Sequence, residues 1–386
     1  KPSSAASDVY KRQGDEFPSK SLAGVGVMFY LLGALRAKLR ELDWFDEHNI
    51  EPLDIVQWLD IVALGTVADV VALDQNNRIL VEQGLRRIRA GKASEGIKAL
   101  LTVAGIDHAR VLASDLGFQL GPRINAAGRL EDMSIGVECL LTNDSMIAAN
   151  IADSLHELNI TRREIESEMH EQALQSLAKL ETNQITESPE PGLCVYQSGW
   201  HQGVVGILAS RLKEKYWRPT IAFADVDEQE IKGSARSIPG LHIRDVLAMV
   251  ASQYPGLIIK FGGHAMAAGL SLQQKNYQVF KSAFNQVLTR WLDGQDLQTQ
   301  ILSDGELMDE QLNLTVAHEI RNAGPWGQGF TVPVFDGRFK VLDQRIVGHK
   351  HLKLSLQAGY GDSILDAILF NYANFDWQTR AETVHI

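Results

Sequence analysis

The chain has 386 residues, a length that exceeds one ordinary hydrophobic core and predicts two or three domains. Its 45% hydrophobic and 22% charged residues are typical of a soluble globular protein, and no apolar run approaches the about 20 residues that a membrane-spanning helix needs. The net charge of −11 argues against a protein that coats nucleic acid over its whole surface, but it permits a local basic groove.

The first third of the chain is predicted to be largely helical, because apolar residues recur at helical spacing over residues 21–42, 77–90 and 96–103. Between these segments, Asp69 stands in the stretch Gly65-Thr66-Val67-Ala68-Asp69-Val70-Val71, which follows a mostly apolar segment. A lone carboxylate in such a run is costly unless it is paired or ligates a cation. The residues alone leave three roles open for Asp69: helix N-cap, buried ion-pair partner or metal ligand.

Residues 117–130 form a block in which Arg123, Asn125 and Arg129 stand among Gly and Ala, with no acidic residue before Glu131. A guanidinium presents a planar fork of donors that suits a phosphate group. The block therefore predicts a phosphate-binding surface. Pairing of the arginines with Glu131 and Asp132 is the alternative.

One long helix is predicted over residues 151–180, with a Pro-containing hinge over 182–192. Residues 193–196, 220–224 and 231–236 are then predicted to be successive strands of an α/β domain.

Three motifs in this α/β part suit phosphate binding. Trp200 and His201 lie in a turn before a glycine-opened helix, an arrangement that can place a phosphate at a helix N-terminus. Ser234 and Arg236 lie in the segment Gly-Ser-x-Arg-Ser, for which a plain turn with a surface arginine is the alternative. Gly262, Gly263 and His264 form the third motif. Paired glycines let backbone N–H groups approach a ligand, although a tight strand-to-helix turn with an exposed histidine is also open.

The C-terminal part changes in character. Polar and apolar residues alternate over 335–341 and 351–356, which is the period of a strand. Residues 337–353 are the most basic window, with five Lys or Arg and one acidic residue, and we expect Lys340, Arg345, Lys350 and Lys353 to contact a nucleic-acid backbone. Short strands of this kind resemble an oligonucleotide-binding barrel, with a β-sandwich as the alternative.

Together these blocks resemble the RecJ-type exonucleases of the Asp-His-His phosphoesterase superfamily. The resemblance runs from about residue 17 to the C-terminus and is strongest over residues 62–270. It implies an α/β fold: part of a parallel-sheet catalytic domain (17–150), a linker helix and hinge (151–192), a smaller α/β domain (193–298) and an incomplete barrel of the oligonucleotide-binding type (299–386). Residues 1–16 match nothing in the family and are expected to be disordered or foreign.

The resemblance also implies a function, namely removal of nucleotides from the 5′ end of single-stranded DNA in repair and recombination. It implies that Asp69 ligates Mn²⁺ or Mg²⁺ in a two-metal site, that residues 117–130 face the nucleic-acid channel, and that Ser234 and Arg236 bind the strand end. Implied partners are single-stranded DNA, a single-strand-binding protein and a RecQ-type helicase. We expect a cytoplasmic monomer, and the separate, apolar settings of Cys139 and Cys194 predict buried thiols rather than a disulfide.

The family's metal ligands are mostly missing. The chain contains no Asp-His-His sequence, and its one similar Asp-x-Asp, at Asp225 and Asp227, lies in the smaller domain. We therefore expect an N-terminally truncated fragment that is inactive alone. Two other functions remain open: a metal-free single-strand-binding or regulatory relative, and a smaller phosphodiesterase that acts on oligonucleotides.

Overall fold

The computed structural model describes residues 16–183, 190–292, 301–358, 363–370, 372 and 381–386. The chain divides into two compact units. Unit 1 comprises residues 1–94, 106–119 and 301–386, and unit 2 comprises residues 95–105 and 120–300. None of the described helices is both long enough and apolar enough to span a membrane.

The N-terminal part of unit 1 is helical, with α2 (Gly24–Glu41), α3 (Trp44–Glu47), α4 (Leu59–Ala68) and α5 (Gln75–Arg89). Helices α4 and α5 cross closely because Gly84 has no side chain. A Cβ at this position would lie only 2.2 Å from the Leu59 carbonyl oxygen. The described residues between 16 and 183 include no strand, so the parallel sheet expected of the catalytic domain is not found in this part of the chain. The amphipathic periods of this region instead give helices.

The C-terminal part of unit 1 holds an antiparallel sheet preceded by helix α14 (Leu314–Asn322). Its strands are β6 (Arg338–Val347), β7 (His351–Ala358), β8 (Ile364–Leu369) and β9 (Thr383–His385), in the order β8-β7-β6-β9. Alternate residues of β7, from Leu352 to Leu356, are buried on one face. The predicted strands are confirmed, and the described strands form an open sheet rather than a closed barrel.

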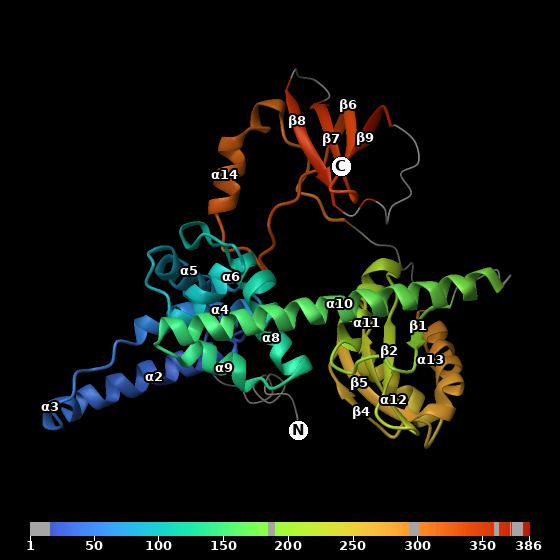
Figure 1. Cartoon of the computed structure of the whole chain (residues 1–386), viewed down its shortest axis with the longest axis horizontal. Helices are drawn as coiled ribbons and strands as arrows, with labels where there is room; N and C mark the ends of the chain where they lie inside the picture. The colour runs from blue at the N-terminus through green and yellow to red at the C-terminus, as the bar shows by residue number, and fades with distance from the viewer. Residues whose placement is uncertain (1–15, 184–189, 293–300, 359–362, 371, 373–380) are drawn as a thin grey trace. The chain divides into compact units, whose positions relative to one another are not determined.

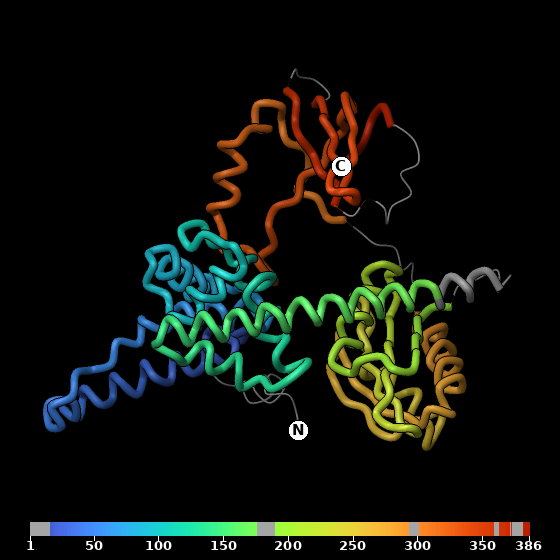
Figure 2. Tube along the Cα trace, viewed as in Figure 1, coloured from blue at the N-terminus to red at the C-terminus, as the bar shows by residue number. Residues whose placement is uncertain are grey.

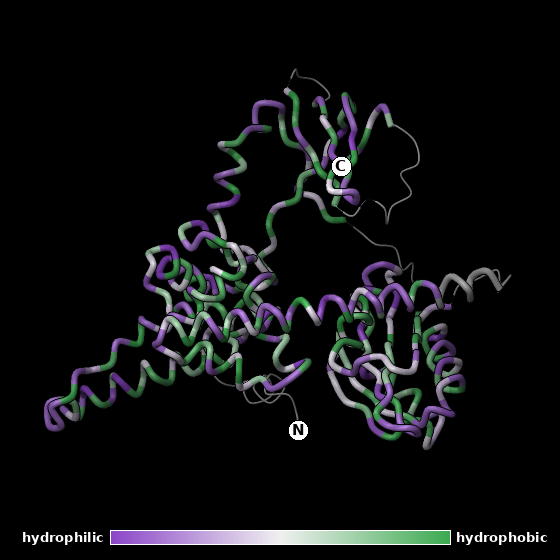
Figure 3. The backbone as a smooth tube through the Cα atoms, viewed as in Figure 1, coloured by the Kyte–Doolittle hydropathy of each residue, from purple (hydrophilic) through white to green (hydrophobic). Residues whose placement is uncertain are grey.

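Unit 2 is organised around α10 (Ser145–Asn183), which contacts α6 (Glu95–Val103), α8 (Gly121–Leu130) and α9 (Ser134–Leu141). Figure 2 shows the coloured part of α10 as one unbroken helix, which confirms the long helix expected from the sequence. Hydrophobic and hydrophilic residues alternate along it in Figure 3, as expected for a helix with one covered face.

The remainder of unit 2 is a five-stranded sheet of β1 (Leu193–Tyr196), β2 (Thr220–Asp225), β3 (Glu230–Arg236), β5 (Ala267–Gln273) and β4 (Lys260–Gly263), in that order. Strands β1 and β2 are parallel and the other neighbours are antiparallel. Helix α11 (Val205–Tyr216) covers one face, while α12 (Ile243–Gln253) and α13 (Tyr277–Trp291) cover the other (Figure 1). The predicted α/β domain is confirmed, and Cys139 and Cys194 are buried free thiols.

Candidate phosphate-binding site

Ser234 and Arg236 lie on β3, on the face that α11 covers. The Arg236 guanidinium donates hydrogen bonds to Ser234 Oγ at 3.0 Å and to Ser210 Oγ of α11 at 3.2 Å. Helix α11 approaches this closely because Gly206 has no side chain: a Cβ there would lie 2.9 Å from Arg236 Nη2. Partial burial, and secondly the charge of Arg129, lower the pKa of Arg236, so a second guanidinium lies nearby.

That second guanidinium comes from α8. Arg129 Nη1 donates to the Gly203 carbonyl at 2.9 Å. A Cβ at Gly203 would lie 2.3 Å from the Arg129 carbonyl oxygen, so a glycine is needed for the two backbones to meet. His201 Nδ1 accepts the Gly203 N–H at 3.1 Å. The structure therefore joins two of the blocks identified from the sequence, residues 117–130 and the loop before α11.

Asp225 fixes this loop. Its carboxylate accepts hydrogen bonds from Tyr196 Oη at 2.6 Å, Ser198 Oγ at 2.8 Å and Gly199 N–H at 2.9 Å. Burial opposes ionisation of Asp225, but these three donors outweigh it, and the pKa of the carboxyl lies below its ordinary value. The first acid of the Asp-x-Asp sequence thus positions the loop that carries His201 and Gly203.

The paired glycines extend the same sheet face. Ser234 pairs with Gly269 of β5, which pairs with Gly262 of β4, and residues directly opposite in a sheet share a face. A Cβ at Gly262 would meet nothing within 4 Å, so no side chain fills the space above this row of glycines beside Ser234. Gly263 has a φ of +148° and no room for a Cβ beside Ala268.

The segment after the paired glycines is a β-hairpin, not the strand-to-helix turn considered from the sequence. The His264 N–H donates to the Ala267 carbonyl at 2.8 Å and closes the turn between β4 and β5. The small residues that follow continue as a strand because they pair with β3. Since Ala267 pairs with Arg236, the exposed His264 lies at the end of the sheet where Arg236 is located.

Sequence reasoning missed a buried polar cluster on α10. Arg162 donates to Asn159 Oδ1 at 2.6 Å and to Glu166 Oε2 at 3.0 Å, and Glu166 Oε1 accepts from Arg211 of α11 at 3.1 Å. Burial lowers the pKa of Arg162, Glu166 raises it, and Arg129 is among the cations that lower it. The signal was present in the sequence, because Arg162 stands seven residues from both Leu155 and Met169 of the apolar stripe.

Trp200 and Arg123 are buried, which changes their expected roles. Trp200 is 6% exposed, and its Nε1–H donates to Gln172 of α10 at 2.8 Å. A ring so covered does not offer a face to a base, so we assign it to packing beneath the loop. Arg123 is 5% exposed and donates to His156 Nδ1 at 3.2 Å. Asn125, in contrast, is exposed on α8.

Asp69 does not have the buried setting suggested by its apolar run. It is exposed at the C-terminal cap of α4. The buried acid of this helix is Asp60, which accepts the N–H groups of Ser94 at 2.6 Å and Ile61 at 2.9 Å. Within the described ranges, no group of three or more His, Cys, Asp or Glu side chains could hold a metal ion. The residues described therefore do not fit a complete two-metal site.

The basic window lies on and beside β6 and β7. Lys340, Arg345 and Lys350 are exposed. Lys353 forms an ion pair with Asp366 of β8 at 2.7 Å. The hydrogen bond from Lys353 is the largest cause that lowers the pKa of Asp366, and the charges of Lys353 and Arg345 lower it further. Part of the positive charge of this window is thus offset within the sheet.

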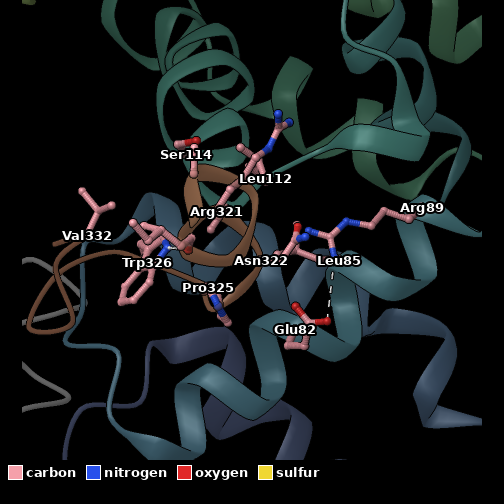
Figure 4. A pocket seen from close by; sticks show the side chains of 14 residues that line it. Glu82, Leu85, Arg89, Leu112, Ser114, Arg321, Asn322, Pro325, Trp326 and Val332 are labelled. Atoms are coloured by element: carbon pink, nitrogen blue, oxygen red, sulfur yellow. Dashed lines mark hydrogen bonds and ion pairs between the residues drawn. The ribbon is translucent and has the colours of Figure 1, made fainter. Parts of the chain in front are cut away.

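Unit 1 also contains a cavity of about 640 Å³, between α5, α14 and the segment around Pro325. Its wall includes Leu85, Trp326 and two arginines, Arg89 and Arg321, and Figure 4 shows Arg89 in an ion pair with Glu82. None of the residues predicted from the sequence to form the site lines this cavity.

Comparison with known proteins supports the relationship suggested by the motifs. A family model described as the DHHA1 domain matches residues 190–290, and one described as the RecJ OB domain matches residues 303–386. The chain is 54% identical over 362 residues to the single-stranded-DNA-specific exonuclease RecJ of Salmonella typhimurium, covering 94% of this chain and 62% of that protein. It is likewise 54% identical over 361 residues to RecJ of Escherichia coli, with the same two shares.

The chain is similar to RecJ proteins over most of its length. Crystal structures of RecJ from Thermus thermophilus in complex with Mg²⁺ and with Mn²⁺ each match at a TM-score of 0.76 and 27% identity. They cover 96% and 97% of this chain, and 53% and 51% of those chains. The chain thus spans about 62% of the length of the curated RecJ proteins named above.

Proposed function

We propose that this chain is part of a single-strand-specific exonuclease that removes nucleotides from the 5′ end of DNA in repair and recombination. The observation that carries the proposal is the cluster of Arg129, Gly203, Gly206, Ser234 and Arg236, to which three separate elements contribute and which we call the proposed pocket. The 54% identity to RecJ exonucleases supports the same activity.

The pocket suits a terminal phosphate better than an internal one. A terminal phosphate carries about −1.5 to −2 charge near neutral pH, whereas a diester carries one negative charge. Two guanidiniums, a hydroxyl and the N-terminal end of a twelve-residue helix all favour the more highly charged group. The side-chain-free row at Gly262 and Gly269 leaves space for the nucleotide beside them.

Mn²⁺ or Mg²⁺ belongs to the same proposal. When bound, a pair of such ions supplies hydroxide and stabilises the charge of an in-line displacement. Asp69 is the residue of this chain that we propose as a ligand. The described residues supply no complete set of ligands, so we expect the chain alone to have little metal-dependent exonuclease activity.

Single-stranded DNA is the proposed substrate, and the basic window from Lys340 to Lys353 is its proposed second contact. We also propose a cytoplasmic monomer that acts with a single-strand-binding protein and a RecQ-type helicase. The free, buried thiols of Cys139 and Cys194 support a reducing compartment.

A metal-free DNA-binding relative is the second candidate. The observation that favours it is the lack of a metal-binding cluster among the described residues. Incubation of the purified chain with Mn²⁺ and labelled single strands gives the first comparison of the two candidate functions. Degradation of the strands would overturn our description of the metal site. If the full-length protein binds 5′ ends but never degrades them, the second candidate is correct.

Arg236→Ala tests the end-binding pocket. We expect the wild-type chain to bind a 5′-phosphorylated oligonucleotide more tightly than its 5′-hydroxyl counterpart, measured by fluorescence polarisation without divalent metal. Loss of a hydrogen bond to a charged group should remove about 1.5–3 kcal/mol of this preference, or about 10- to 150-fold. The control is Arg244→Ala, because Arg244 is exposed on α12, which covers the opposite sheet face. If Arg236→Ala weakens both strands equally, the pocket does not recognise the end.

A further inference from the structure

The covered face of α10 has a polar centre. Over residues 145–175, its buried positions recur every three or four residues: Ala148, Ala152, Leu155, Asn159, Arg162, Glu166, Met169 and Ala173. Five of the eight are apolar, as expected for a packed helix seam, and the three polar residues are consecutive in this series. Burying charged groups is costly, and an apolar replacement of a buried ion pair is often as stable or more stable. Stability alone therefore does not explain this centre.

The polar centre connects the parts of the phosphate-binding site. Glu166 accepts from Arg162 on its own helix and from Arg211 on α11. Arg211 directly follows Ser210, the hydroxyl that accepts from Arg236. On the other side, α10 packs on α8, the helix that carries Arg129. The centre thus lies between α8, which supplies Arg129, and α11, which packs on Arg236.

Charge gives a reason for a carboxylate at this position. Arg162 and Arg211 both bond to Glu166, and Arg129 and Arg236 both lie against the segment from Gly203 to Gly206, so like charges within each pair repel when no ligand is bound. Within the described part of the chain, Glu166 is the one carboxylate that forms ion pairs with these four arginines. Glu166 pairs with Arg162 and Arg211. Arg129 instead donates to a carbonyl, and Arg236 donates to hydroxyls. Those two guanidiniums therefore retain their charge for an incoming anion.

We propose that Asn159, Arg162 and Glu166 are positioning residues for end recognition: they hold Arg129 and α11 in the arrangement in which Arg129 and Arg236 bind one terminal phosphate. This proposal rests on the proposed function and adds to it the residues that set the spacing of the two guanidiniums. Loss of the Glu166 charge leaves Arg162 and Arg211 unneutralised, and their repulsion moves Arg129 and α11 apart.

The test compares Glu166→Gln with Glu164→Gln in the full chain described here. Both variants remove one negative charge from α10, but Glu164 is exposed and Glu166 is 9% exposed. The measurement is the ratio of dissociation constants for 5′-hydroxyl and 5′-phosphorylated oligonucleotides. We expect Glu166→Gln to lower this ratio by about tenfold, the factor that corresponds to one hydrogen bond to a charged group. Glu164→Gln should keep the ratio.

A double variant, Arg162→Met with Glu166→Met, separates positioning from stability. It leaves the net charge unchanged, and Arg211, whose side chain is 59% exposed, can return to water. We expect an unfolding midpoint in urea at or above that of the wild type, together with a lost end preference. A folded double variant that keeps the wild-type ratio overturns the proposal. If the double variant does not fold, the Glu166→Gln ratio decides.

Arg236→Ala, measured in parallel, distinguishes failure of this inference from failure of the proposed function. If Arg236→Ala loses the end preference and Glu166→Gln keeps it, the pocket stands and the positioning role is wrong. If Arg236→Ala also keeps the preference, the pocket itself is wrong, and the role of the polar centre falls with it.

Discussion

Gly206→Ala should separate the stability of the protein from recognition of the strand end. Gly206 is the second residue of α11, and the added Cβ would lie 2.9 Å from Arg236 Nη2 and 3.1 Å from Ser234 Oγ. Both atoms are ends of side chains, and the long arginine side chain can move aside. We therefore expect Arg236 to be displaced while the fold is kept.

The two effects have different magnitudes. Alanine is a better helix former than glycine by about 1 kcal/mol in a helix interior, which offsets the local crowding, so the free energy of unfolding should change by less than about 1 kcal/mol. Displacement of the guanidinium removes a charged hydrogen bond to the phosphate, so the 5′-phosphate preference should fall about tenfold. Urea titration measures the first quantity and fluorescence polarisation measures the second.

Two further glycines calibrate this result. Gly24 begins α2, and a Cβ added there would meet nothing within 4 Å, so Gly24→Ala should keep the end preference and change the free energy of unfolding by no more than about 1 kcal/mol. Gly203→Ala places its Cβ 2.3 Å from a backbone oxygen of Arg129, which cannot move aside as a side chain does. We expect that variant to lose stability as well as end preference. A Gly206→Ala variant with full end preference would show that Arg236 is not where the phosphate binds.

Three other changes test the remaining assignments. Replacing all four basic-window residues by Ala should weaken binding to every single strand and flatten its salt dependence by about one unit of slope for each phosphate that is no longer neutralised. Lys353 should contribute least because Asp366 pairs with it. An unchanged slope would show that the window is only a solvated surface. In the full-length enzyme, Asp69→Ala should abolish turnover and spare DNA binding, whereas near-normal turnover would make Asp69 structural. Trp200→Phe should cost about 1 kcal/mol of stability through loss of the hydrogen bond to Gln172 and leave DNA affinity unchanged; weaker binding at unchanged stability would return Trp200 to the binding surface.

Periodicity made the local elements of this chain predictable. The strand over residues 193–196 has the predicted bounds, and the helices over 24–41 and 75–89 begin and end within three residues of the predicted ones. The hairpin at His264 was not predictable in the same way. Its glycines and alanines have no apolar period, and only pairing with β3, about 30 residues earlier, makes them a strand.

Burial of single polar residues was harder to predict than the elements that carry them. Asp60 and Asp69 belong to the same apolar stretch, but the Ser94 N–H, 34 residues away in sequence, bonds to Asp60. Trp200 stands beside a histidine in a loop, yet Gln172, 28 residues earlier, holds it in the core. In each case a partner distant in sequence decides which side chain is covered, and local patterns carry no information about that partner.

The polar centre of α10 is the exception, because its signal was local. Where the other positions of a helical repeat are apolar, a charged residue at one of them indicates a buried charge from the amino-acid pattern alone. Its partners were not local: Glu166 pairs with Arg211, 45 residues away, and α10 packs on α8, which carries Arg129. A helix seam that includes an ion pair is less favourable as simple packing than an apolar one, but it fixes where the guanidiniums on either side lie. Since Arg129 and Arg236 come from different parts of unit 2, the residues that hold α8 and α11 in place also determine whether the two guanidiniums can bind the same phosphate.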